Sequence, residues 1–322
     1  MRLIYILLAF LTIHLTACGK KSSARDGTSD VSLKEIGLAN MKKGLWCDGM
    51  PTYGGTNNVT GRADCNNGDG MIWAGLVYSV WPTQEIKNGI KNSIDADGRQ
   101  FRSFEHRLGR DNENSFSRDM YLGFLSYCLK DKDKETCDKV LDYAVRNDYQ
   151  LCPDSNDNAC LMNPSMLYLT YAVWDENGWS LPNSAFKPNI AERAADDLSM
   201  LTTAKTSALS YRTHLLAVKI WLYAKTEGVT ETRKQAAGEL WKRQKDNLFY
   251  WYVAWLTGYA PDSDHGRISE RVRAMGTTWE PSATHTGRRD WIWQQDVLSL
   301  ENYGRAMGQD FGFLLCEIAQ GC

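Results

Sequence analysis

The feature that most constrains the fold is a repeated alternation of almost wholly apolar segments with amphipathic ones. Residues 70–81 are apolar nearly all round, which is typical of a helix buried on every side. Residues 84–94 instead carry Ile86, Ile90 and Ile94 at i, i+4 and i+8 among polar side chains. The further expected apolar segments are 116–129, 163–174, 206–225 and 248–259, the further amphipathic ones are 134–148, 189–201, 231–245 and 267–275, and 310–319 closes the chain.

This alternation predicts an all-α fold in which apolar helices form an inner layer and amphipathic helices a half-exposed outer layer. In segment 189–201 the stripe of Ile190, Ala194, Leu198 and Leu201 is the expected inward face. Residues 248–253 have the composition of a buried strand, but no alternating partner lies nearby, so a helix is favoured. About five to six helical hairpins can close into an α/α toroid, and the alternative is an open α-solenoid, which a repeat of about 45 residues also suits.

The first residues predict export. Arg2 precedes an apolar run, residues 3–15, that is too short to span a bilayer as a finished helix. The run ends in Leu15, Thr16, Ala17 and Cys18, which resembles the lipobox of bacterial lipoproteins. The resemblance implies a signal peptide at residues 1–17 and a lipid-bearing Cys18, and Gly19 after it implies sorting to an outer membrane, facing the periplasm or the cell surface. Residues 18–31 are predicted to be a flexible tether and residues 32–322 a single all-α domain.

The cysteine count agrees with an oxidising compartment. The chain has nine cysteines, and with Cys18 lipidated the other eight can pair in 105 ways. Pairing of nearest neighbours is the simplest arrangement, because each pair then closes a short loop. The expected disulfides are Cys47 with Cys65, Cys128 with Cys137, Cys152 with Cys160 and Cys316 with Cys322. Because the chain has no CxxC motif and no cysteine at ligand spacing from a histidine, no metal site is predicted.

Charge and motifs exclude several functional classes. The formal net charge is −2 and the isoelectric point is about 6.2, so the chain lacks the basic excess of a nucleic-acid-binding protein. It also has no nucleophile elbow, Walker loop, dinucleotide fingerprint or HExxH motif. These absences count against serine, nucleotide-dependent and zincin hydrolases, and no cofactor is expected.

Candidate catalytic residues precede the apolar segments, because the ends of the inner helices of a ring of hairpins converge on one mouth. Asp119 falls in the first turn of an apolar helix, where apolar surroundings and Arg118 can adapt a carboxyl group for general acid catalysis. Asp69 is the candidate base, and His106 is a candidate proton carrier. The alternative is structural: Asp119 complements a helix dipole, Asp69 caps a helix, and His106 belongs to a surface ion-pair network.

Candidate substrate-binding residues surround these groups. Arg107 and Arg118 can hold an acidic group in bidentate fashion, and Asp111 lies beside them in sequence. Near the C-terminus, residues 280–296 mix charged and aromatic side chains and contribute His285, Asp290, Trp291 and Trp293. Tryptophan faces, including that of Trp73, can stack on sugar rings, although most tryptophans belong to a core. His214 lies inside an apolar segment and is expected in the core.

The alternation, together with the sequence SRDMYLGFL at residues 117–125, resembles the α/α-toroid enzymes that process polysaccharides. The resemblance implies hydrolysis by two carboxyl groups, or β-elimination at a uronic acid by a set of His, Tyr and Arg residues. The predicted function is therefore a lipoprotein that binds and cleaves a polysaccharide. The alternative is a non-catalytic helical lipoprotein that binds a glycan or a protein, so whether the chain is an enzyme stays open at this stage.

Overall fold

The computed structural model describes residues 27–43, 46–51, 70–108, 116–152, 160–182, 189–245, 247–266, 269–270 and 308–322. These residues are mostly helical, which confirms the predicted all-α class. The sheet within them is one antiparallel pair, β1 (Trp46–Cys47) with β2 (Met50–Pro51), in which Cys47 lies opposite Met50. None of the described helices has both the length and the apolar character needed to cross a membrane.

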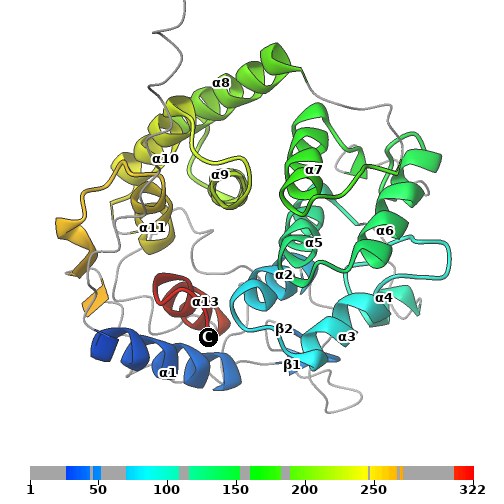
Figure 1. The fold of residues 1–322 in the computed structure, drawn as a ribbon, viewed down its shortest axis with the longest axis horizontal. Coiled ribbons are helices and arrows are strands. Elements are labelled where there is room, and N and C mark those ends of the chain that lie inside the picture. Colours follow the sequence, from blue (N-terminus) through cyan, green and yellow to red (C-terminus); the bar gives the residue numbers. More distant parts are fainter. Residues whose placement is uncertain are drawn as a thin grey trace, which may run out of the picture.

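The helices follow the predicted alternation (Figure 1). The largely buried ones are α2 (Gly70–Val80), α5 (Arg118–Asp131), α7 (Pro164–Glu176), α9 (Tyr211–Lys225) and α11 (Leu248–Leu256). The more exposed ones are α3 (Gln84–Asn92), α6 (Lys134–Arg146), α8 (Ile190–Thr206) and α10 (Glu231–Arg243), and a short α4 (Phe104–Arg107) lies between α3 and α5. Residues 248–256 are helical, as predicted, and the predicted segment 267–275 lies almost entirely outside the described residues.

Polar caps set where these helices begin. The side chain of Asn163 accepts a hydrogen bond from the backbone of Met166, and Pro164 occupies the first turn of α7. Ser210 forms a capping box with Thr213, so α9 begins at Tyr211, five residues later than predicted, while α8 continues to Thr206.

Helix α1 (Gly27–Lys43) was not predicted, and it packs against α13 (Gly308–Ile318). Its inward stripe places Gly37 and Asn40 between apolar residues, so its hydrophobic period is weak. The glycines allow α1 and α13 to cross closely. A Cβ atom on Gly312 of α13 would lie 2.8 Å from the carbonyl oxygen of Gly37 and 2.2 Å from Met41 Cγ. Because α1 begins at Gly27, the predicted tether boundary at residue 31 was wrong, and residues 27–31 are helical.

Helix α13 connects the two ends of the described chain. On one side it contacts α1 and α2 (Figure 1). On the other side its buried Glu317 accepts hydrogen bonds from Trp221 Nε1 of α9 (3.2 Å) and Tyr252 Oη of α11 (2.6 Å). Lys225 Nζ lies 3.0 Å from the same carboxylate, so the charge of Glu317 is compensated. The last helix is thereby fixed to both the earliest and the latest inner helices.

The structure confirms three predicted disulfides. Cys128–Cys137, Cys152–Cys160 and Cys316–Cys322 have Cα–Cα separations of 6.0, 5.5 and 5.2 Å. Cys47 is also disulfide-bonded, and its predicted partner Cys65 lies outside the described residues. Each short loop is expected to stabilise the fold by about 2–3 kcal/mol.

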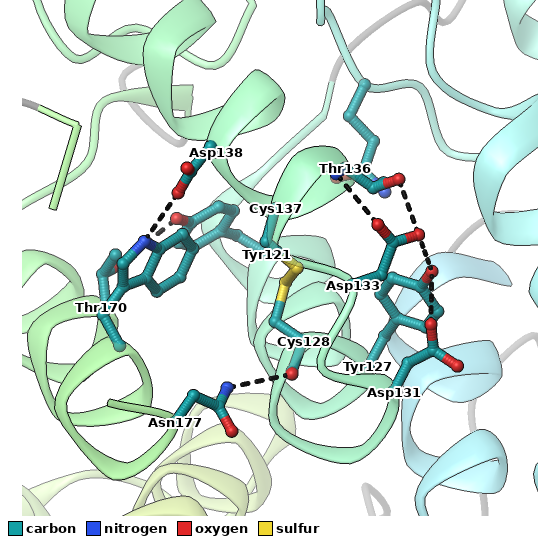
Figure 2. Close-up of a disulfide and its surroundings, with 12 residues drawn as sticks. Tyr121, Tyr127, Cys128, Asp131, Asp133, Thr136, Cys137, Asp138, Thr170 and Asn177 are labelled. Carbon is teal, nitrogen blue, oxygen red and sulfur yellow. Dashed lines mark hydrogen bonds between the residues drawn. A yellow bond between two sulfur atoms is a disulfide. The ribbon is translucent and has the colours of Figure 1, made fainter. Parts of the chain in front are cut away.

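Polar links surround the first of these disulfides and fix α6 between its neighbours (Figure 2). Asn177, after α7, donates to the carbonyl oxygen of Cys128 at 3.1 Å, and Trp174 Nε1 donates to Asp138 at 3.0 Å. Asp133 caps α6 through Thr136 and accepts a hydrogen bond from Tyr127 Oη at 3.1 Å. The C-terminal ends of α5 and α7 and the N-terminal end of α6 are therefore joined by a disulfide and by hydrogen bonds.

Helix α8 is turned differently from the prediction. Ile190 is 88% exposed and Leu198 is 60% exposed, whereas Asp196 and Asp197 are buried. Asp196 lies 2.8 Å from Lys219 Nζ, and Asp197 lies 2.7 Å from Arg233 Nε. Partners on α9 and α10 therefore hold the polar face of α8 inside, and the apolar stripe faces outward; of its four predicted residues, only Leu201 packs partly against the core.

Candidate functional site

A cleft of about 730 Å³ lies where the N-terminal ends of α5, α7 and α9 meet. Arg118, Ser165 and Tyr211 come from the first turns of these three helices. Residues of α8 line one side of the cleft. The lining residues are Ile72, Arg102, Ser117, Arg118, Asp119, Leu122, Asn163, Ser165, Met166, Ser199, Met200, Thr203, Tyr211, Arg212, Leu215, Leu216 and Lys219.

Two of the candidate residues named from the sequence, Asp119 and Arg118, line this cleft. Both are half-buried in the first turn of α5, and neither forms an ion pair with another described residue. Leu122, one turn further along α5, adds an apolar surface beside them. A carboxylate and a guanidinium group are therefore available here to a ligand.

Helix α9 supplies groups that the sequence analysis did not single out. Arg212 Nε donates to Tyr211 Oη at 3.3 Å, and both side chains are exposed at the start of the helix. Two turns later, the buried Lys219 also lines the cleft. The signal that could have revealed it is a lysine inside the otherwise apolar run at 215–223.

Lys219 is held by a buried network. Its Nζ contacts Ser165 Oγ and lies 2.8 Å from Asp196 Oδ1, while Tyr223 Oη donates to Asp196 Oδ2 at 3.0 Å. Burial lowers the pKa of Lys219, and the charge of Asp196 acts in the opposite direction. The network places an amino group and a hydroxyl group together at the floor of the cleft.

Three predicted site residues lie elsewhere. His106 is 1% exposed, with Nδ1 2.7 Å from Ser103 Oγ, and it does not line the cleft. Arg107 packs over the ring of Phe104, with 4.9 Å between the guanidinium carbon and the ring centroid. Trp73 is fully buried, so its predicted stacking on a sugar was wrong: its ring packs in the core, 5.5 Å from that of His214.

The other predicted residues lie outside the described part of the chain. These are Cys18, Asp69, Asp111, His285, Asp290, Trp291 and Trp293, and their roles stay predictions. Within the described ranges, no group of three His, Cys, Asp or Glu side chains is arranged to hold a metal ion. Comparison of the chain with protein-family models, with curated proteins and with solved structures finds no match. Function is therefore argued from the cleft.

His214 is buried on α9, as the sequence predicted, and it makes a testable contribution to stability. Burial lowers its pKa to about 3, well below the value of about 6.5 in an unfolded chain. Between these two values the unfolded state binds a proton that the folded state does not. Stability is therefore greatest above pH 6.5 and falls towards pH 3, by on the order of 5 kcal/mol over the whole window.

We expect His214→Leu to remove this pH dependence. Between pH 7 and pH 4.5 the unfolding free energy of the natural protein should fall by about 2–3 kcal/mol more than that of the variant, measured by chemical denaturation. Asp133 does not interfere with this test. Burial would raise its pKa, but hydrogen bonds from Lys91 and Thr136 outweigh burial and lower the pKa to about 2. Its contribution to the unfolding free energy is therefore lost only below about pH 4, outside the range compared. Parallel curves for the two proteins would contradict the assignment.

Proposed function

We propose that the protein is a lipoprotein, held at the outer membrane through Cys18, that binds a polysaccharide in the cleft and cleaves it. The observation that carries this proposal is the convergence of three inner-helix ends, with Asp119 among them, on one cleft of about 730 Å³. Such a volume is that of a pocket for an organic ligand. The cysteine pairs in the described chain are consistent with an exported protein.

We propose further that the hairpins close into an α/α toroid. The support is the position of α13, which contacts α1 and α2 on one side and is hydrogen-bonded to α9 and α11 on the other. In an open solenoid each repeat contacts only its neighbours, so the last helix would lie far from the first. Closure also accounts for the meeting of inner-helix ends over one cleft.

The surface of the cleft suits a sugar chain. Sugar rings present hydroxyl groups at their edges and C–H bonds on their faces. Asn163, Ser199 and Thr203 offer hydrogen-bonding groups, while Leu122 and Leu216 offer apolar contact.

Asp119 is the proposed general acid. In its protonated form it gives a proton to the glycosidic oxygen that leaves, and it ends as a carboxylate. In hydrolysis a base activates the attacking water, and Asp69 is the candidate for that role. In β-elimination the base instead removes a proton from the sugar, and Tyr211, which accepts a hydrogen bond from Arg212, is the candidate for that role. The two reactions give different products, a new reducing end or an unsaturated sugar.

We expect Asp119→Asn to abolish most turnover, with a fall in kcat of about 10²–10⁴. Thermal stability should change little, because Asp119 forms no ion pair with the other described residues. The assay is release of reducing ends and of unsaturated products from a polysaccharide panel.

The matched control for this variant is Glu135→Gln, which changes an exposed acid in the first turn of α6, outside the cleft. This control should retain full activity. Retained activity of Asp119→Asn, or a large loss of its stability, would show that Asp119 has only a structural role.

A non-catalytic glycan-binding module is the second candidate. The observation that favours it is that Asp119 is the sole carboxylate among the described residues that line the cleft. This alternative predicts binding of a polysaccharide by the natural protein and by Asp119→Asn alike, with no products of cleavage in either case.

A further inference from the structure

The charges that line the cleft are unbalanced. Arg118 and Arg212, which form no ion pair within the described chain, face one carboxylate, Asp119, while the ammonium group of Lys219 is already paired with Asp196, which does not itself line the cleft. The whole chain has a formal net charge of −2, so this positive excess is local and does not follow from composition. A concave surface lined by one sign of charge concentrates ligands of the opposite sign.

Helix α9 arranges two of these cations at different depths. Arg212, Leu215, Leu216 and Lys219 follow the i, i+3, i+4, i+7 spacing of one helix face, and all four line the cleft. Arg212 is exposed at the opening and Lys219 is buried at the floor, about 10 Å apart along the helix axis. A ligand that reaches both must be extended, with an apolar surface against the leucines between them.

The floor of the cleft has donors left for an anion. An ammonium group has three N–H donors, and Asp196 and Ser165 account for two of those on Lys219. Because Ser165 Oγ accepts from Lys219, its own O–H is free to donate in another direction. Asp196, fixed by Tyr223, keeps the ammonium in place and offsets part of its charge. At the opening, Arg118 forms no ion pair within the described chain, and Arg212 contacts Tyr211.

Building on the proposed function, we infer that the substrate is a polysaccharide with anionic groups, carboxylate or sulfate, on its sugars. Lys219 and Ser165 bind one such group at the floor, and Arg118 and Arg212 bind another at the opening. A neutral glycan would remove water from these cations without supplying counter-charges, which is unfavourable.

Binding of matched polymers by the purified protein tests this inference. The carboxylate arm compares polygalacturonate with its fully methyl-esterified form, and the sulfate arm compares dextran sulfate with dextran. We expect an acidic member to bind at least about ten-fold more tightly than its neutral counterpart, and the difference to shrink as salt rises. The arm with the larger difference identifies the anionic group.

Charge-removing variants assign the binding to named residues. Arg212→Gln, and the double change Asp196→Asn with Lys219→Met, should each weaken binding of the acidic polymer about ten-fold and leave weak binding of the neutral one unchanged. The double change avoids leaving Asp196 buried without its partner. Lys42→Gln, an exposed change on α1, is the matched control and should have no effect.

Failure of the anionic-substrate inference and failure of the proposed function give different binding results. Equal binding of acidic and neutral polymers, or variants without effect, overturns the anionic substrate and leaves the proposed function standing. Absence of binding to every polymer overturns both.

Discussion

Replacing Gly123 with alanine is expected to destabilise the protein severely, by about 3 kcal/mol or more. A Cβ atom on Gly123 of α5 would lie 2.3 Å from Ile72 Cα and 2.4 Å from the carbonyl oxygen of Met71 in α2. At Gly75, on the other side of the same crossing, a Cβ atom would lie 1.8 Å from the carbonyl oxygen of Gly123. These are backbone atoms, so no side-chain rotation relieves the clash and the two helices must separate.

Chemical denaturation measures this loss. The control is Gly266→Ala, because a Cβ atom at that exposed position would meet nothing within 4 Å and its backbone is not left-handed. The control should stay within about 0.5 kcal/mol of the natural protein. If Gly123→Ala costs no more than Gly266→Ala, the close contact of α2 with α5 is not as described.

Replacing Arg233 with methionine is expected to cost about 3–5 kcal/mol of unfolding free energy. The Arg233 side chain is 4% exposed and forms ion pairs with Asp197 at 2.7 Å and Glu227 at 3.0 Å. Its guanidinium carbon also lies 3.8 Å from the centroid of the Tyr223 ring. Without Arg233, Asp197 remains buried with a hydrogen bond from Thr230 but no counter-charge.

A second substitution separates lost charge pairing from lost packing. Asp197→Asn combined with Arg233→Met should recover part of the stability, because no unpaired buried charge remains. Lys242→Met, which breaks an exposed ion pair with Glu239, should cost less than about 1 kcal/mol. If Arg233→Met costs no more than Lys242→Met, the buried pair does not hold α8 in its orientation.

The sequence predicted the inner helices well because burial on every side requires apolar residues at nearly every position. Segments 70–81 and 248–259 are examples, and both contain helices close to the expected limits. Helix α1 escaped prediction because Gly37 interrupts its apolar stripe, and the reason for a glycine there is α13, whose residues lie far along the chain. The orientation of α8 was predicted wrongly because the partners of Asp196 and Asp197 are not visible in a local pattern.

The candidate site shows the same limit. Asp119 and Arg118 were predictable, because polar residues in the first turn of a buried helix must lie at its end and therefore near the surface. Trp73 was not, because an aromatic residue in an apolar helix can face either the core or the cleft, and it faces the core. Lys219 became a candidate only once α7 and α8 were seen to bring Ser165 and Asp196 to it.

The early start of α1 limits how far the folded domain can lie from the membrane if Cys18 carries lipid. Eight residues lie between Cys18 and Gly27, and even fully stretched the chain from one to the other extends only about 30 Å. With so short a connection, the folded domain would stay close to the bilayer and could not reach ligands far from it. If the proposed polysaccharide binding is right, the polymer would therefore have to reach the membrane surface or already be attached there.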